Sequence, residues 1–296
     1  MNATPVRDLL AAASRPTLSL EFFPPKTLLD FGLLGSVIER MRPVHPDFVT
    51  CTYGAGGSSR DLSFAAWDLL ARLDFTPVVA HLTCVGASCG DLVAQIHRIY
   101  AAGIRNIMAL RGDPPRGQTA FKPHPEGLAH AVDLVRLVKL LHPDLCCGVA
   151  GYPEIHPEAA SPADDIRHLR EKIDAGADFV HTQLFYDNAH FYRFRDAATA
   201  AGVTVPILPG LMPIATLAQL QRSVAFSNSA VPPSLAAALA AAPTPKAAAD
   251  VGMDWLIRQI DDLVSHGVPG IHLYIMNRAN ALLDPRLTAC LARWRA

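Results

Sequence analysis

The sequence lacks any uninterrupted apolar run of the ~18 residues needed to span a bilayer, and its formal net charge is only −1. Its first residues carry Arg7 and Asp8 before a short Leu/Ala run, which is not the pattern of a signal peptide. The arginines are scattered, so no broad basic surface for nucleic acid is expected. We therefore expect a cytoplasmic protein that binds neither membrane nor nucleic acid.

Metal and lysine chemistry are also poorly represented. The six cysteines form no C-x-x-C pair, so neither a zinc site nor a disulfide framework is indicated, and no bound metal is expected. The first predicted strand has no paired histidines, which argues against a metal-dependent barrel hydrolase. No lysine falls within a predicted strand, which argues against a Schiff-base aldolase; the lysines are at 26, 122, 139, 172 and 246.

What the chain does contain is a repeated alternation of short β-rich runs with helical segments. Half of its 296 residues are hydrophobic and 18% are charged, which predicts a large packed core. A count of eight such strands is typical of a (β/α)8 TIM barrel, an α/β fold, and we expect one barrel over residues 1–296. The runs are Thr17–Phe23, Asp47–Tyr53, Pro77–Thr83, Ile104–Leu110, Leu145–Tyr152, Asp178–Phe185, Val205–Leu211 and Gly270–Met276.

The segments between the strands have helical periodicity, for example Asp91–Ala102 and Ala163–Ala175. Several of these end at a glycine, which favours a helix C-terminus; they are Gly103, Gly176 and Gly267. The Ala- and Pro-rich stretch Asn228–Asp250 delays the last strand. We interpret it as an additional helical excursion.

Polar side chains follow most of the strands, where a TIM barrel places its chemistry. The period of two in the first strand directs Leu18, Leu20 and Phe22 toward the helices and Ser19, Glu21 and Phe23 inward. The polar residues at the other strand ends are Thr50, Thr52, His81, Thr83, Arg111, Gly112, Asp113, Tyr152, Gln183, Asn277 and Arg278. We expect these groups to converge on one mouth.

Alternatives exist for several of these residues. Glu21 could act as a general acid or form an ion pair with Arg278. Asp113 could form a local salt bridge with Arg111, and His81 could be a hydrogen-bonded core histidine. A buried Gln183 amide would need several hydrogen-bond partners, which a ligand could provide.

Two further patterns concern phosphate binding. The run Gly54–Ser59 has no third glycine in the position that a dinucleotide fingerprint requires, so a Rossmann site is not expected. Asp165, His168, Leu169 and Lys172 are spaced to share one helix face. There, Lys172 could hold a phosphate and Asp165 a ribose hydroxyl, although a solvated polar stripe is the alternative.

Seven motifs, in order, resemble bacterial single-domain methylenetetrahydrofolate reductases over about residues 17–280. This resemblance implies reduction of 5,10-methylenetetrahydrofolate to 5-methyltetrahydrofolate for methionine synthesis, with FAD as cofactor, NADH or NADPH as reductant and a ping-pong order. We also expect a homo-oligomer, although the sequence leaves its size open. The motifs are Ser19–Pro25, Val49–Ala55, Ala80–Cys84, Ala109–Pro115, Tyr152–Ala159, Asp174–Asp178 with Thr182-Gln183, and Leu273–Ala279.

The resemblance also implies a role for individual residues. Glu21 would protonate the bridging nitrogen of the folate, and Asp113 would meet the pterin and tune the flavin. Folate would contact Gln183, Leu217, Tyr274 and Arg278. The FAD site would comprise Thr52, Tyr53, Ala55, His81, Leu110, Arg111, Gly112, Asp113, His130, Ala131, Tyr152, His156, Asp165, His168 and Lys172.

The chain departs from the family pattern at three places. His130 precedes Ala131 where tyrosine is usual, and Leu217 stands where some members have phenylalanine. His168 and Glu171 replace an amide and a basic residue, which leaves Lys172 as the main cation near the FAD phosphates. A barrel that binds folate or flavin without catalysis, or that transfers hydride without FAD, is therefore the alternative.

Overall fold

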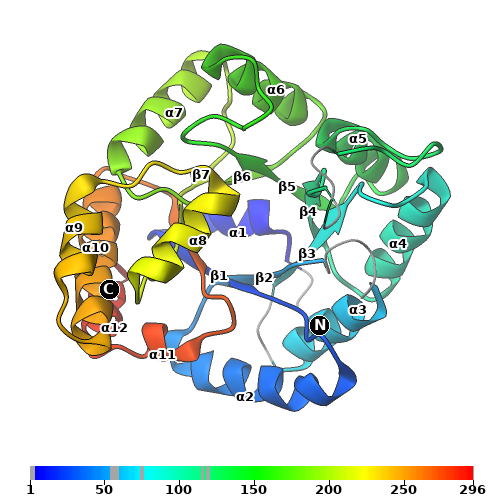
Figure 1. Cartoon of the computed structure of the whole chain (residues 1–296). Helices are drawn as coiled ribbons and strands as arrows, with labels where there is room; N and C mark the ends of the chain where they lie inside the picture. Colours follow the sequence, from blue (N-terminus) through cyan, green and yellow to red (C-terminus); the bar gives the residue numbers. More distant parts are fainter. Residues whose placement is uncertain (1–3, 54–59, 74–76, 115–116, 118–120, 296) are drawn as a thin grey trace.

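The computed structural model describes residues 4–53, 60–73, 77–114, 117 and 121–295. It contains a parallel sheet surrounded by helices, which Figure 1 shows in a view down the ring of strands. The strands are β1 (Thr17–Phe22), β2 (Phe48–Cys51), β3 (Val78–Thr83), β4 (Asn106–Leu110), β5 (Cys146–Gly151), β6 (Phe179–Thr182), β7 (Ile207–Leu208), β8 (Gly210–Leu211) and β9 (Gly270–Tyr274).

Most of the helices follow the strands around the outside of the ring, whereas α1 and α8 lie across it in the view of Figure 1. Two short 3-10 turns, η1 (Leu28–Asp30) and η2 (Arg42–Val44), flank the first of these outer helices. The α-helices are α1 (Val6–Ala12), α2 (Phe31–Met41), α3 (Arg60–Arg72), α4 (Cys89–Ala101), α5 (Ala131–Leu141), α6 (Pro162–Asp174), α7 (Asn188–Ala200), α8 (Leu217–Ser227), α9 (Pro233–Ala241), α10 (Pro245–Ser265), α11 (Ala279–Leu282) and α12 (Pro285–Arg295).

The ring closes through a strand that proline divides in two. β7 pairs with β6 and β8 pairs with β9, and only Pro209 separates β7 from β8. Proline has no N–H to donate to the ladder, but the Pro209 carbonyl accepts a hydrogen bond of 2.9 Å from the His272 N–H. Together β7 and β8 form the seventh strand of the barrel and β9 forms the eighth, which confirms the predicted (β/α)8 fold.

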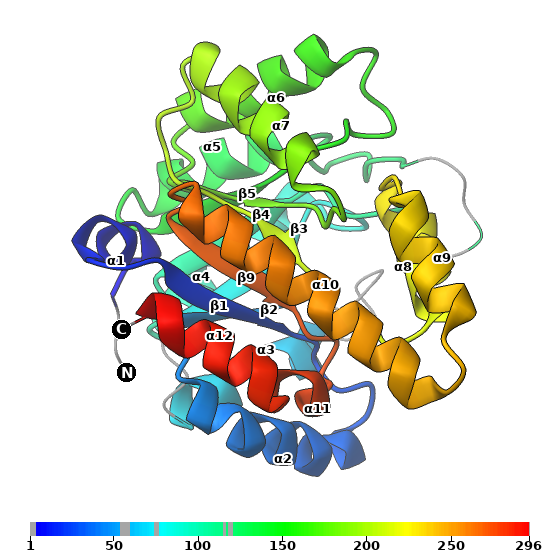
Figure 2. The same ribbon diagram turned by 90° about the vertical axis from the view of Figure 1, so that its left-hand side faces the viewer.

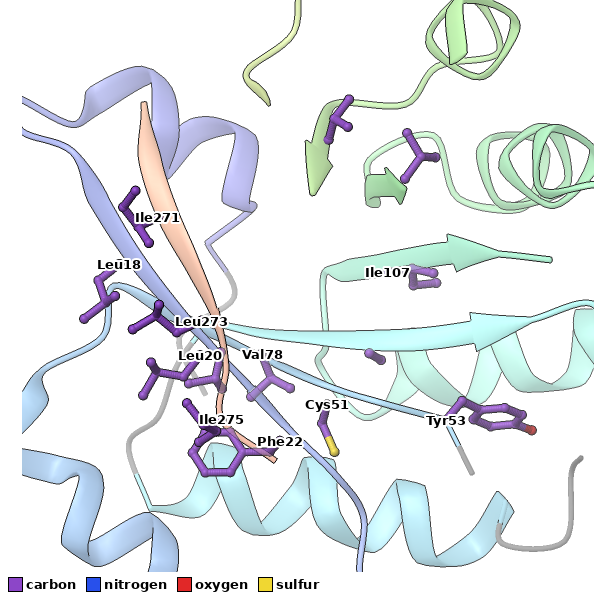
Figure 3. Packing of buried hydrophobic residues seen from close by; sticks show 14 of the residues in the cluster. Leu18, Leu20, Phe22, Cys51, Tyr53, Val78, Ile107, Ile271, Leu273 and Ile275 are labelled. Carbon is purple, nitrogen blue, oxygen red and sulfur yellow. The ribbon is translucent and has the colours of Figure 1, made fainter. Parts of the chain in front are cut away.

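The alternation along β1 follows the prediction. Leu18, Leu20 and Phe22 are fully buried in the cluster that joins the strands to the helices, and Figure 3 shows them with their neighbours. Ile38 of α2 belongs to the same cluster. Burying each such side chain contributes about 1.5–3 kcal/mol. Glu21 is buried on the opposite side of the strand, inside the barrel.

A helix that the sequence patterns did not indicate covers one end of the barrel. Figure 2 shows α1 at this end and α8 with α9 at the other. The Val6 N–H donates to Oδ1 of Asn106 at 2.6 Å. The side chain of Val6 joins the apolar interior, which comprises Val6, Phe48, Val79, Met108, Cys146, Phe179 and Leu208.

The expected helical excursion before the last strand is confirmed as α9 and the beginning of α10, which starts at Pro245. These helices enclose a second apolar cluster with Leu184, Tyr186, Met212, Ile214, Leu220, Leu235, Leu239 and Ala248. The predicted glycine ends are also confirmed, because Gly103, Gly176 and Gly267 have φ of 81°, 107° and 72°. None of the described helices combines the length and the apolar character that crossing a membrane requires.

Candidate functional site

Glu21 lies at the end of β1, and its side chain is 9% exposed. Its Oε2 atom is 3.7 Å from Nε2 of His81 on β3 and 3.8 Å from Nε2 of His272 on β9. Among the described residues these histidines, rather than Arg278, are the basic side chains beside its carboxylate. The pKa of His81 falls to about 4 because burial disfavours the imidazolium, and the nearby Glu21 offsets only part of this.

The turn after β4 brings backbone and charge together. Gly112 has φ of 88°, and a Cβ atom there would lie 2.8 Å from Cγ1 of Val85, so this position requires glycine. Arg111, next to Leu110 at the end of β4, pairs with both carboxylate oxygens of Glu158 rather than with Asp113. Asp113 is exposed and has no hydrogen bond or ion pair with another residue of the described ranges.

Strand β5 and the segment after it are connected to helix α6 by one polar contact each. The Asp165 carboxylate accepts a 2.9 Å hydrogen bond from the His156 N–H, and Nζ of Lys172 donates to the carbonyl of Ala150 at 2.6 Å. Burial lowers the pKa of Lys172 to about 8, and Asp165 opposes this decrease. Tyr152 packs edge-on against His156 with 4.6 Å between ring centroids, and burial raises the pKa of Tyr152 to about 12.

His168 lies apart from Asp165 and Lys172. Its side chain is 51% exposed and lies beside Asp164 and Glu171, 3.2 Å from the Glu171 carboxylate. The polar stripe expected as the alternative is therefore present at this position. His130 is the exposed N-cap residue of α5, and Ala131 is the first residue of that helix.

The ends of β2 and β6 carry further predicted residues. The Thr52 N–H donates to the Phe22 carbonyl at 2.9 Å, and the hydroxyl of Tyr53 donates to Oε1 of Gln95. Oε1 of Gln183 accepts a 2.8 Å hydrogen bond from the Leu184 N–H. Ala55 and the glycine-rich run 54–59 lie outside the described residues.

The remaining residues expected to contact folate come from three elements. The hydroxyl of Tyr274 donates to the Thr182 carbonyl at 2.7 Å, and burial raises its pKa well above the usual value. Leu217 begins α8 and packs against the second apolar cluster. Arg278 is exposed at the start of α11, and its guanidinium has no hydrogen bond or ion pair within the described part of the chain.

Comparisons with known proteins agree on one family. The family model described as methylenetetrahydrofolate reductase matches residues 6–284. A 5,10-methylenetetrahydrofolate reductase of Pectobacterium carotovorum is 36% identical over 274 residues, covering 92% of this chain and 90% of the relative. The chain belongs to the methylenetetrahydrofolate reductase family.

Other relatives of this reductase family are longer. A probable methylenetetrahydrofolate reductase (NADH) of Oryza sativa is 34% identical over 284 residues, and the chain spans 48% of its length. A solved structure has a TM-score of 0.67 at 16% identity and covers 98% of both chains. It is an uncharacterised protein from Clostridium thermocellum, described as binding two copies of 5-methyl-5,6,7,8-tetrahydrofolic acid. At this identity it supports the fold alone.

Some side chains at this candidate site were not singled out from the sequence. His272 is buried beside Glu21, His181 is buried and stacks on His272, and Glu158 pairs with Arg111. The period of two that directs Glu21 inward also directs His181 inward, two residues before Gln183, and His272, two residues before Tyr274. The alternation along these strands therefore could have identified both histidines from the sequence. No local pattern pairs Arg111 with Glu158, 47 residues away.

Proposed function

We propose that this chain reduces 5,10-methylenetetrahydrofolate to 5-methyltetrahydrofolate with NADH or NADPH, in a ping-pong order, with FAD as resident cofactor. In the cytoplasm the product would supply methyl groups for methionine synthesis. The observation that carries the proposal is the carboxyl group of Glu21, which is buried inside the barrel mouth with the imidazoles of His81 and His272 beside it. It is supported by membership of the family.

The residues present fit FAD. Lys172 and Asp165 provide a cation and a carboxylate joined to one segment of the mouth, suited to a phosphate and a ribose hydroxyl. Gly112 lets the backbone approach closely where a larger residue would clash. When bound, FAD would supply the hydride chemistry between nicotinamide and folate.

The remaining tasks fall to the protein. The Glu21 carboxyl would donate a proton to the bridging nitrogen, which is a poor leaving group until it is protonated. Gln183 and Arg278 would orient the folate, because an amide and a free guanidinium can bond its polar edges. Asp113, exposed at the Gly112 turn, would accept hydrogen bonds from the pterin.

The proposal is tested by separating the two half-reactions at Glu21. Glu21→Gln keeps the size of the side chain but removes its transferable proton. Stopped-flow measurements should show near-normal flavin reduction by NADH and about 10²- to 10⁴-fold slower reoxidation by methylenetetrahydrofolate. Glu39→Gln, a surface change on α2, is the matched control and should leave both steps unchanged. Equal losses in both steps would mean that Glu21 shapes the barrel instead.

A second candidate is hydride transfer without FAD. It is favoured by Arg111, whose charge is neutralised by Glu158, and by His168, which faces Asp164 and Glu171. Both pairs reduce the positive charge available to a pyrophosphate. Purified protein that is colourless yet fully active, with no flavin released on denaturation, would favour this candidate over the first.

A further inference from the structure

Three buried histidines lie inside the barrel, two of them beside Glu21 and the third stacked on one of these, and each has a ring nitrogen without a hydrogen-bond partner among the described residues. His81 on β3, His181 on β6 and His272 on β9 are at most 6% exposed. The Nε2 atom of each is buried without a hydrogen-bond partner among the described residues. A buried polar atom without a partner has lost its hydration and gained nothing in exchange. Two of these atoms flank one oxygen of Glu21.

His272 is connected to β1 at its other nitrogen. Its Nδ1 atom is 2.9 Å from Oγ of Ser19, and that hydroxyl is also 3.5 Å from the Ile271 carbonyl. Because a hydroxyl can both donate and accept, Ser19 can serve either neutral form of the imidazole. The hydrogen bond at one ring nitrogen decides whether the other carries the proton. Ser19 is therefore suited to both tautomers of His272.

His181 keeps positive charge away from this arrangement. Its ring stacks on His272 with 4.0 Å between centroids, and its surroundings include Phe48, 5.8 Å away, and Phe179, 5.1 Å away. Burial lowers the pKa of His181 well below its usual value, and the neighbouring His272 and His81 lower it further. A neutral ring therefore packs against His272.

We propose that His272 is a positioning residue for Glu21, acting through two neutral tautomers that Ser19 accommodates; this rests on the proposed function, in which Glu21 is the acid. When Glu21 is protonated, Nε2 accepts its hydrogen bond, Nδ1–H donates to Ser19, and the Ser19 hydroxyl turns to the Ile271 carbonyl. When Glu21 has lost its proton, Nε2–H donates to the carboxylate and Ser19 donates to Nδ1. The proton of Glu21 goes to the folate nitrogen, while the imidazole and Ser19 each carry one proton in both states. The imidazole changes tautomer by giving its Nδ1 proton to water and taking a proton from water at Nε2.

The spacing requires a small adjustment. Nε2 of His272 is 3.8 Å from Oε2 of Glu21, just beyond direct hydrogen-bonding distance. A side-chain rotation or one bridging water would connect the two atoms. A neutral partner orients the carboxyl group of Glu21 without favouring its ionised form. An arginine in the same place would favour the ionised form through its positive charge. The other titratable groups facing Glu21 are His81, Cys51 and Tyr274, and Glu21 helps to raise the pKa values of the last two.

The first test uses the protein without substrate. Nitrogen-15 NMR of histidine-labelled protein reports the tautomer of each imidazole, and His272→Gln identifies the resonances of His272. In the wild type, the tautomer of His272 should change with pH as Glu21 titrates. Glu21→Gln should abolish that change, and Ser19→Ala should shift the tautomer ratio. If neither substitution changes the tautomer ratio of His272, the proposal is overturned.

The second test is the pH profile of flavin reoxidation by methylenetetrahydrofolate. His272→Leu should slow this step about tenfold or more and should shift the apparent pKa of its pH profile by about one unit. Flavin reduction by NADH should be unchanged. His272→Gln places an amide near Nε2 and should restore most of the rate. His97→Gln, an exposed histidine of α4, is the control.

The outcomes separate the two levels of the argument. If Glu21→Gln slows only the folate step but no His272 variant changes the pH profile, the positioning role is overturned and the function stands. If Glu21→Gln affects neither step or both equally, the proposed function fails, while the tautomer measurement still decides the Ser19–His272 link. Equal losses for His272→Leu and His272→Gln in both steps, with lowered melting temperatures, would assign His272 a purely structural role and overturn the proposal.

Discussion

At the residue scale, the environment of Lys172 connects burial to cofactor affinity. Its ammonium group donates to the Ala150 carbonyl, which leaves two donors for a ligand. Burial favours the neutral amine and lowers the pKa to about 8, while the Asp165 carboxylate favours the charged form. Below this pH, the protein without cofactor presents a cation, and above it the charge is lost.

The affinity for FAD should therefore fall as the pH rises above about 8. A bound phosphate raises the pKa of Lys172, so the dissociation constant should increase gradually between pH 8 and the higher pKa of the complex. Loss of a charge-assisted hydrogen bond is worth about 1.5–3 kcal/mol, or roughly ten- to hundredfold in Kd. Fluorescence titration of the apoprotein with FAD between pH 7 and 10 measures this.

Two variants provide the controls for this pH dependence. Lys172→Arg keeps its charge over the whole range, so its dissociation constant should vary much less with pH. Lys172→Met removes the charge and should bind FAD weakly at every pH. A wild-type dissociation constant that stays constant up to pH 10 would show that Lys172 does not contact the phosphates.

The sequence predicts the direction of some individual side chains but not their long-range partners. The inward direction of Glu21 follows from the period of a strand, a local property. The partners of its neighbours do not, because Glu158 reaches Arg111 only through the fold. His168 shares helical spacing with Asp165 and Lys172, yet lies beside Glu171 on the exposed side. Spacing alone cannot separate the edge of a helix face from its centre.

At the scale of elements, two glycines inside helices differ in what surrounds them. In α10, a Cβ atom at Gly252 would lie 1.7 Å from the Ile214 carbonyl oxygen, so the helix packs directly on the backbone after β8. In α2, a Cβ atom at Gly35 would have no neighbour within 4 Å. The same substitution should therefore have opposite effects in the two helices.

Gly252→Ala should lower the free energy of unfolding by about 1–3 kcal/mol or more, because a backbone carbonyl must move to admit the methyl group. Gly35→Ala should raise it by about 0.4–1 kcal/mol, since alanine restricts the unfolded chain and favours the helix. Urea unfolding of both variants beside the wild type measures the difference. If both substitutions raised the free energy of unfolding equally, helix propensity rather than the contact with Ile214 would dominate at Gly252.

The elements themselves were predictable to different degrees. The eight strands follow from apolar β-rich runs because each has to be buried on both faces. Helix α1 has only seven residues and no side-chain N-cap hydrogen bond, so its stability comes from contacts that the sequence does not display. The division into β7 and β8 depends on Pro209, which interrupts the pairing without ending the strand direction.

At the scale of the whole molecule, the candidate site and the apolar interior that α1 covers lie at opposite ends of the barrel. The site residues lie at the carboxyl ends of the strands, as in other barrels of this kind. At the other end, α1 closes an interior of apolar side chains, and Arg7 secures it through Asp178 and the Asp144 carbonyl. Changes at the two ends should therefore be separable.

Val6→Ala tests this separation, because Val6 is fully buried at the closed end. Removing its two methyl groups should lower the free energy of unfolding by about 1–3 kcal/mol through lost burial and a residual cavity. Leu140→Ala, near the end of α5 at a side chain that is 78% exposed, should change stability by less than about 0.5 kcal/mol. Both variants should bind FAD and complete the two half-reactions at wild-type rates, since neither residue lies at the mouth.

Urea unfolding with and without FAD distinguishes the effects at the two ends of the barrel. The stabilisation conferred by saturating FAD should be equal in Val6→Ala and wild type, because it depends only on the cofactor concentration and its dissociation constant. A smaller stabilisation in Val6→Ala would mean that packing at the closed end is coupled to the mouth.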